Sequence, residues 1–366
     1  MNCTESRRQF INKGLVTSAG LLWPSGIELT KVMAAETTPE SGKTGQITIE
    51  ETRKIYSTPD GGKLRYNAFT SMEFWRGKYY VAFRQGVKHS PSECRLVMIE
   101  STDLENWTER VVLNRPLIDD RDPKLLSTPD RLFLYTVPYP RDSEVMSTQD
   151  GVRWTDPVDA YPSSNGDQFW KPKFYNGSYY VASDYNNDRV DLLKSTDGLS
   201  WQHAGTILEG TKYKPTEIAL VFLQDGRCLA FLRMNNIGPS GTLPGFAISS
   251  PPYTSWDLTV GQAVRFSGHA VERFGNTILV ASRAEIGKGP GRWDIPGERA
   301  SQRTVLYTFN LETMRLEFQA LLPSEHYRDS SYVGLVKTGE SSAVISWHDG
   351  NTRNESNIWL ARISIG

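Results

Sequence analysis

The sequence predicts an all-β fold, a six-bladed β-propeller of four-stranded antiparallel blades. Three observations predict it: a hairpin pattern that recurs six times, a turn motif ending in Trp, and a composition rich in strand and turn formers. The 366 residues include 10 Trp, 16 Tyr, 30 Gly and 20 Pro, which favour strands and turns over helices. Repeats of roughly 50 residues that can each form four strands are typical of propeller blades.

Each hairpin consists of an apolar strand, a two-residue turn and a second apolar strand. The second strands share an alternating pattern, as in KYYVAFR, SYYVASD and TILVASR. Alternation with period two and Asn-Gly or Asp-Gly turns indicate β-hairpins. The turns lie at Arg76-Gly77, Pro129-Asp130, Asn176-Gly177, Asp225-Gly226, Gly275-Asn276 and Thr338-Gly339.

A second motif follows the first hairpins. It reads STDLENW from residue 101 to 107 and STDGLSW from 195 to 201, with one inserted residue at 147–154 and a degenerate form without Asp at 249–256. The Asp can accept backbone N–H bonds in a tight turn, and the Trp can pack back on the sheet. These segments resemble the Asp-box of sialidases and related propellers, so we expect them to be structural.

The segment QITIEETRKIY, residues 46–56, is a spare strand before the first repeat. We expect it to complete the last blade beside SNIWLARISI, residues 356–365, which would protect the final edge. A five-bladed ring is the alternative if the degenerate fifth repeat is not a blade.

The N-terminus is predicted to be a secretory signal. Arg7 and Arg8 precede an apolar stretch at 14–23, and Val32 and Ala34 are placed like a small-residue cleavage site. The paired Arg favour the twin-arginine type, with a short amphipathic helix as the alternative. The apolar stretch is too short to span a bilayer stably, so we expect an exported, periplasmic or secreted protein with no membrane span. The predicted organisation is a signal (1–34), a linker (35–46) and the propeller (47–366).

The composition argues against several classes of partner. Lys and Arg number 41 against 42 for Asp and Glu, so no basic field favours nucleic acid. Five scattered His show no metal-ligand spacing, and we expect neither a metal nor a cofactor. With Cys3 in the signal, we expect Cys94 and Cys228 to be buried free thiols, with a single bridge as the alternative.

Polar residues recur where the first strand of each hairpin begins and where the second ends. Because first strands line the central channel, these positions should converge on one mouth. Several Arg around a pocket favour an anionic ligand, because a guanidinium binds a carboxylate through two hydrogen bonds. The alternative for each Arg is a strut paired with a local carboxylate. The set comprises Arg65, Tyr66, Asn67, Arg84, Arg121, Asp122, Trp170, Lys171, Asp184, Thr216, Glu217, Arg233, His269, Arg283, Asp329 to Tyr332 and His348.

Three of these stretches carry a resemblance to the sialidase family. The stretch TEIALVFLQDGRCLAFLR (216–233) resembles the pattern of Glu, apolar strand, Asp-Gly turn and distant Arg. The stretch DSSYVGLV (329–336) is similar to the segment with the tyrosine nucleophile, and RYNAF (65–69) lies where the first sialidase arginine would lie. With the Asp-box-like repeats, the resemblance covers nearly all of residues 50–360.

The resemblance implies a covalent mechanism. Tyr332 would attack the anomeric carbon and Glu217 would take its proton. The alternative for Tyr332 is an aromatic residue that fills the channel, and for Trp170 a core position rather than a sugar-stacking one. Substrate binding is assigned to Arg65, Arg84, Arg121, Arg233, Arg283, Asn67, Trp170, Lys171 and His269, and the resemblance gives the substrate carboxylate to Arg65, Arg233 and Arg283.

The sequence departs from the family at the acid/base position. The loop QGVKHSPSE (85–93) has no Asp where sialidases have one. His89, Glu93 or Asp122 could protonate the leaving group, and imidazole titrates in a suitable range. The family's F-R-I-P opening is also absent. These departures leave room for another acidic sugar, such as a uronic or ulosonic acid.

The predicted function is therefore an exo-acting glycoside hydrolase that releases a terminal acidic sugar, sialic acid or a related one. One alternative is a lyase or other carbohydrate-active enzyme acting on uronic-acid glycans. In a five-bladed glycosidase, Asp122 and Glu217 would be paired carboxylates. A non-catalytic carbohydrate-binding propeller is the third possibility, because one fold hosts many functions. Neither the linkage nor the oligomeric state follows from the sequence.

Overall fold

The computed structural model describes residues 47–59, 62–139, 142–161, 167–185, 188–210, 212–351 and 354–366. The predicted signal and linker lie outside these residues. All regular elements within them are β-strands, which confirms the all-β prediction. In the same ranges, no helix has the length and apolar character needed to cross a membrane.

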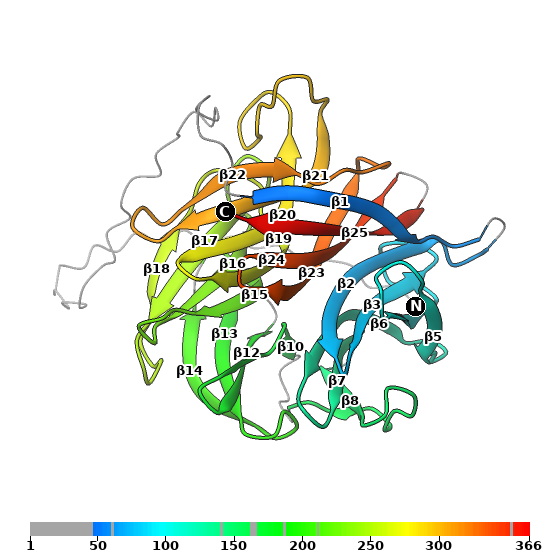
Figure 1. Ribbon diagram of the computed structural model, residues 1–366. Coiled ribbons are helices and arrows are strands. Elements are labelled where there is room, and N and C mark those ends of the chain that lie inside the picture. The colour runs from blue at the N-terminus through cyan, green and yellow to red at the C-terminus, as the bar shows by residue number, and fades with distance from the viewer. Residues whose placement is uncertain are drawn as a thin grey trace, which may run out of the picture. The chain divides into compact units, whose positions relative to one another are not determined.

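Four of the five hydrogen-bonded sheets are single blades, each an antiparallel array in chain order. Figure 1 shows them from cyan-green to orange along the chain. Their strands are β6 (Asp119–Ser127), β7 (Leu132–Tyr139), β8 (Glu144–Thr148) and β9 (Val158–Asp159); β10 (Asp167–Phe169), β11 (Lys173–Tyr175), β12 (Ser178–Tyr185), β13 (Arg189–Ser195) and β14 (Trp201–Glu209); β15 (Pro215–Phe222), β16 (Cys228–Asn235), β17 (Thr242–Ser249) and β18 (Asp257–Val260); and β19 (Ser267–Phe274), β20 (Thr277–Ile286), β21 (Ser301–Asn310) and β22 (Arg315–Leu321).

The fifth sheet has eight strands and combines the two ends of the chain. It comprises β23 (Asp329–Gly339), β24 (Ser342–Gly350), β25 (Ser356–Ile365) and β1 (Ile47–Tyr56), followed by β2 (Tyr66–Trp75), β3 (Lys78–Gly86), β4 (Cys94–Ser101) and β5 (Thr108–Leu113). A parallel pairing of Tyr66 with Ser356 joins its two halves. The prediction of six separate blades is therefore wrong: four blades stand alone, and the first and last arrays are hydrogen-bonded to each other.

The spare strand closes the structure as the sequence predicted. β1 pairs antiparallel with β25, from Ile47 opposite Ile365 to Tyr56 opposite Ile358. Figure 1 shows the two strands, blue and red, side by side. This pairing protects the backbone groups of the final edge.

The hydrophobic core lies between successive sheets, as a propeller requires. Phe231 of β16 packs on Phe309 of β21, with ring centroids 4.9 Å apart. On the other side of the same blade, Leu220 and Leu232 pack with Val190 and Leu192 of β13. Each sheet therefore buries both faces against its neighbours.

The repeated Ser-Thr-Asp segments form one kind of turn. One oxygen of Asp103, Asp150 and Asp197 accepts the backbone N–H groups two and three residues later, each at 2.8 Å. These bonds lower the pKa of the Asp103 carboxyl below its usual value. Such side-chain bonds fix tight turns and serve the fold.

A β-bulge recurs in the first strand of five arrays. Phe69, Asp122, Glu217, Gly268 and Tyr332 have φ of 63°, 46°, 50°, 58° and 50°, and the strand pairing shifts register at each of them. A bulge adds one residue and turns a side chain in a new direction. Positive φ is costly for residues other than Gly and clusters at functional sites. The repeated strain indicates that these side chains serve a site.

Candidate active site

The central feature is a contact between Tyr332 and Glu217, from strands β23 and β15. The Tyr332 hydroxyl donates to Glu217 Oε1 at 2.6 Å. Arg233 Nη1 lies 2.5 Å from the same oxygen, and the backbone N–H of Gly268 donates to Oε2 at 2.5 Å. Three of the bulge residues thus meet in one hydrogen-bonded group.

Charges in this group keep the carboxyl ionised and the phenol protonated. Burial opposes ionisation of Glu217, but Arg233, the Tyr332 hydroxyl and the Gly268 N–H overcome it and lower its pKa to about 2. Burial, and then the Glu217 charge, raise the pKa of Tyr332 well above its usual value. At neutral pH the proton of this pair therefore stays on Tyr332.

A cavity of ≈ 280 Å³ opens above the pair. Its lining brings together Arg121, Asp122, Trp170 and Arg233 with Tyr332 and Glu217. Trp170 donates its Nε1 proton to Asp184 at 2.8 Å, which fixes the indole in the wall. An aromatic face, two guanidinium groups and two carboxylates in one cavity suit an acidic sugar.

Asp122 is the second carboxylate of the cavity. Its Oδ1 is buried and has no hydrogen-bond partner among the described residues. Lys124 lies next to it, with Nζ 3.1 Å from the Asp122 carbonyl oxygen, and burial lowers the pKa of this lysine. A buried carboxylate oxygen that bonds no protein group is costly, so its position in the cavity lining favours a polar ligand group as its partner.

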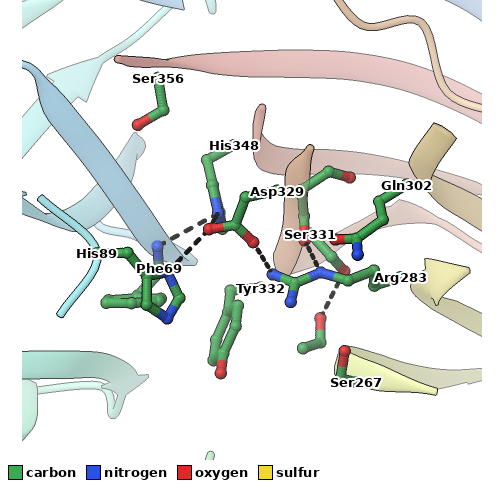
Figure 2. Close-up of polar contacts among 12 residues, drawn as sticks. Phe69, His89, Ser267, Arg283, Gln302, Asp329, Ser331, Tyr332, His348 and Ser356 are labelled. Atoms are coloured by element: carbon green, nitrogen blue, oxygen red, sulfur yellow. Dashed lines mark hydrogen bonds and ion pairs between the residues drawn. The ribbon is translucent and has the colours of Figure 1, made fainter. Parts of the chain in front are cut away.

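A second network lies beside Tyr332 and is centred on Asp329 (Figure 2). Asp329 Oδ2 lies 2.8 Å from His89 Nδ1 and 3.7 Å from His348 Nε2, while Arg283 pairs with Oδ1. The Tyr66 hydroxyl also donates to Asp329. Burial opposes the ionisation of Asp329, but Arg283 and the two imidazoles hold its pKa well below the usual range.

Arg283 links the two networks. Its Nε donates to the Ser330 carbonyl at 2.5 Å, and its guanidinium carbon lies 5.7 Å from the centre of the Tyr332 ring. The side chain is buried. Arg283 thus packs beside the Tyr332 phenol and does not line the cavity that contains Arg121 and Arg233.

Three residues assigned to substrate binding lie elsewhere, which corrects the predicted convergence. Arg65 is half-exposed and pairs with Glu355 at 2.9 Å. Arg84 is fully buried against Asp119, with 2.5 Å between Nε and Oδ1. Asn67 is buried and donates to the Ser356 carbonyl at 2.8 Å. The physical reason is that each of the three side chains is held by a partner outside the cavity. The residue of this strand that packs on Tyr332 is Phe69, with ring centroids 4.7 Å apart.

Lys171 and His269 lie in a narrower cavity of ≈ 40 Å³ that also contacts Glu217 and Tyr332. Lys171 Nζ donates to the Met72 carbonyl at 3.1 Å. His269 Nε2 lies 3.0 Å from the Phe231 carbonyl, and burial lowers its pKa to about 4. Both side chains border the pair, but neither lines the larger cavity.

Sequence reasoning did not find Lys124 or the central position of Asp329. Lys124 lies two residues after Asp122 in RDPKL, and Asp329 begins the strand that carries Tyr332. That proximity is the only signal the sequence offers.

The described residues contain no group of three or more His, Cys, Asp or Glu side chains that could hold a metal ion. Cys94 and Cys228 are buried and free, which confirms that prediction. Burial raises the pKa of the Cys94 thiol to about 12. Burial also raises the pKa of the Cys228 thiol, so we expect neither thiol to be a nucleophile at neutral pH.

Comparisons with known proteins support the fold. A protein of unknown function from Dyadobacter fermentans has a TM-score of 0.69 at 16% identity, over 88% of this chain and 100% of that one. NanB sialidase from Streptococcus pneumoniae has a TM-score of 0.59 at 10% identity, over 85% and 70%. An α-L-arabinofuranosidase from Fusarium graminearum has a TM-score of 0.61 at 12% identity, over 87% and 98%.

No family model matches the sequence, and no curated protein does. At these identities the similar structures show the fold alone. The chain therefore has a β-propeller fold that sialidases and arabinan-degrading glycosidases also have.

Proposed function

We propose that the protein is an exo-acting glycoside hydrolase that releases a terminal acidic sugar, sialic acid or a related one. The observation that carries the proposal is the 2.6 Å hydrogen bond from Tyr332 to Glu217 inside a cavity that also holds Arg121 and Arg233. A phenol beside a base is a usable nucleophile toward a carbon that bears a carboxylate, because a charged nucleophile would be repelled.

The first step forms a bond between the Tyr332 oxygen and the anomeric carbon. The phenolic proton passes to Glu217, and the bond to the leaving-group oxygen breaks as Asp122 gives that oxygen a proton. In the second step, water attacks the anomeric carbon and gives a proton to Asp122. The Tyr332–carbon bond breaks, and Glu217 returns its proton to Tyr332, so that both groups are restored.

Arg233 couples binding to catalysis in this scheme. In the free protein it lowers the pKa of Glu217 and makes that carboxylate a weak base. A substrate carboxylate paired with Arg233 would weaken this effect and raise the pKa of Glu217. Binding of the acidic sugar would therefore make Glu217 a stronger base at the moment it is needed.

Asp122 is our candidate for the acid because it lines the cavity and has a buried oxygen without a hydrogen-bond partner among the described residues. His89 is held by the Tyr66 hydroxyl at 2.7 Å and by Asp329, and it does not line this cavity. Arg121 takes the place that the resemblance gave to Arg65. It donates to the His89 carbonyl at 3.1 Å, which fixes it at the cavity wall.

A paired-carboxylate glycosidase is the second candidate. Asp122 and Glu217 line the same cavity, and the arabinofuranosidase match extends over 98% of that enzyme. In this case the two carboxylates would serve as acid and nucleophile or base. Tyr332 would then shape the cavity without reacting.

The test is release of 4-methylumbelliferone from its sialoside and glucuronide conjugates. Turnover that Tyr332→Phe abolishes supports the tyrosine mechanism, and turnover that it spares supports the carboxylate pair. An unsaturated product, seen by its absorbance, would instead indicate a lyase. Glycan binding without turnover would indicate a carbohydrate-binding propeller.

Export completes the proposal. The predicted twin-arginine-type signal supports export to the periplasm or beyond, where terminal acidic sugars of extracellular glycans would be the substrates.

A further inference from the structure

The narrower cavity of ≈ 40 Å³ next to Tyr332 and Glu217 is a candidate site for a second ligand, and we call it the channel cavity. Its lining includes residues of β2, β6, β11, β15, β19 and β23, so all five sheets contribute to it. A volume of this size has room for about three water-sized particles and none for a sugar ring. Any ligand of the channel cavity is therefore a water molecule or a small ion.

Three lysines line the channel cavity, and two of them have a partner of opposite charge. Lys171 Nζ lies 3.5 Å from the Glu73 carboxylate, and Lys173 Nζ donates to Glu272 at 2.6 Å. Among the described residues, no carboxylate forms an ion pair with the third lysine, Lys124; its hydrogen bonds go to carbonyl oxygens. Lys124 therefore carries the surplus positive charge of the three.

The ammonium group of Lys124 is buried and only partly satisfied. The residue is 8% exposed, and its Nζ donates to the carbonyl oxygens of Asp122 and Pro123 at 3.1 and 3.5 Å. An ammonium group has three donors, so one remains for a further acceptor. The Trp170 ring, whose centre lies 5.1 Å from Nζ, stabilises the cation without neutralising it. A buried charge without a counter-ion is costly, which favours an anion beside Lys124.

The other titratable groups near Lys124 do not replace that anion. Glu217 and Asp122 act on Lys124 only at longer range. Glu217 is already paired with Arg233, at 2.5 Å, and Asp122 enters the proposed reaction as a neutral acid. His269 adds no charge to the lining, because burial lowers its pKa to about 4. The channel cavity therefore has a net positive charge in the state that is ready to react.

We propose that the channel cavity binds one small monovalent anion, of the size of chloride, against the ammonium group of Lys124. The anion accepts the remaining hydrogen bond of Lys124 and neutralises its charge. Lys171 borders the same cavity and adds to the attraction. The small volume admits chloride and bromide and excludes bulky anions such as gluconate.

The anion also acts on the proposed catalytic pair, a consequence that rests on the proposed function. Glu217 lines the channel cavity, so a negative charge in it opposes the effect of Arg233 and raises the pKa of Glu217. A carboxylate with a higher pKa is a stronger base toward Tyr332. Turnover is therefore expected to be severalfold faster when the anion is bound.

Binding is tested on the wild-type protein with halides. Bromide scatters X-rays anomalously, and crystals soaked in sodium bromide are expected to show a peak in the channel cavity, within hydrogen-bond distance of Lys124 Nζ. In solution, the thermal midpoint is measured in sodium gluconate and in sodium chloride at the same ionic strength. Chloride is expected to raise the midpoint saturably, by about 2 °C, because it binds the folded protein and not the unfolded chain.

Two variants identify the side chain. Lys124→Met keeps the length of the side chain without its charge, and it is expected to abolish both the bromide peak and the rise in midpoint. Lys78→Met is the matched control, because Lys78 pairs with Glu100 at 3.1 Å and lines neither cavity. It is expected to keep both effects. The kcat of the wild type in the same two salts measures the effect on turnover.

Bromide peaks confined to the protein surface would indicate an adventitious ion only and would overturn the site. A chloride effect on the midpoint that survives Lys124→Met would overturn it too, and if that variant does not fold, the wild-type bromide peak decides. Bromide beside Lys124 with equal kcat in both salts would confirm the site and overturn the effect on Glu217. No turnover of either 4-methylumbelliferyl conjugate would overturn the proposed function, while the bromide peak would still decide the anion site.

Discussion

The buried Glu217 carboxylate allows a prediction that joins stability to pH. Glu217→Gln keeps the shape of the side chain but removes the charge that pairs with Arg233 at 2.5 Å. Glu217 is only 5% exposed, so solvent screens this pair weakly. The variant therefore lacks a favourable charge interaction that the wild type has at neutral pH.

The magnitude follows from the pKa, which falls from 4.5 to about 2 on folding. A group whose pKa is depressed in the folded state stabilises above its unfolded pKa and loses that contribution as pH falls through the folded value. This difference in pKa corresponds to a contribution of about 3 kcal/mol to the free energy of unfolding at pH 7. About 2 kcal/mol of that contribution is lost by pH 3. The gap in stability between wild type and Glu217→Gln should shrink accordingly.

The assay is urea unfolding of both proteins at pH 7, 4 and 3. Glu100→Gln is the matched control, because Glu100 is also buried and paired, with Lys78 at 3.1 Å, but lies outside the cavity. Glu217→Gln should lose turnover by about 10²–10⁴-fold, as expected for a missing general base, whereas Glu100→Gln should not. A stability gap that is the same at pH 3 and pH 7 would show that the charge on Glu217 does not stabilise the fold.

Three further predictions concern other residues of the site. Asp122→Asn should lower kcat/KM for substrates with a sugar leaving group by about 10²–10⁴-fold, and far less for a glycosyl fluoride, whose leaving group needs no proton. Equal losses in kcat/KM for the two substrates would exclude Asp122 as the acid. Arg121→Ala should raise KM for the acidic substrate about tenfold and weaken its salt dependence, and an unchanged KM would remove Arg121 from substrate binding. Arg84→Met should lower the free energy of unfolding by about 3 kcal/mol, because it leaves Asp119 buried without its main partner. The folded fraction of this variant should keep its turnover. A stable but inactive variant would show that Arg84 belongs to the site.

Much of the fold follows from the sequence because its signals are local. The Asn176-Gly177 pair forms the turn between Tyr175 and Ser178, with both φ values positive, as a tight hairpin requires. The pairing of β1 with β25 follows from an unpaired strand at one end and an edge at the other. The joint between Tyr66 and Ser356 has no such signal, because it is a single pairing between distant residues.

The site was predictable where strand starts converge, as for Tyr332, Glu217 and Arg233. It was not predictable in blade one, because the partners of Arg65 and Asn67 are Glu355 and Ser356, 290 and 289 residues away along the chain. A pattern of alternating residues does not reveal a contact between segments so far apart. The predicted positions of Arg65 and Asn67 were therefore wrong.

Arg84 shows a second limit. A buried arginine that anchors a loop and one that binds a substrate occupy the same strand position, and the distinction depends on Asp119, 35 residues away. That contact has no periodicity that a sequence could display.

The covalent role of Tyr332 is tested by the intact mass of the protein after reaction with a 2,3-difluoro acidic sugar, a reagent class that slows hydrolysis of a glycosyl-enzyme. We expect an adduct of one sugar residue, located by peptide mapping on Tyr332 and absent from Tyr332→Phe. An adduct on Glu217 or Asp122, or turnover with no adduct at all, would contradict it.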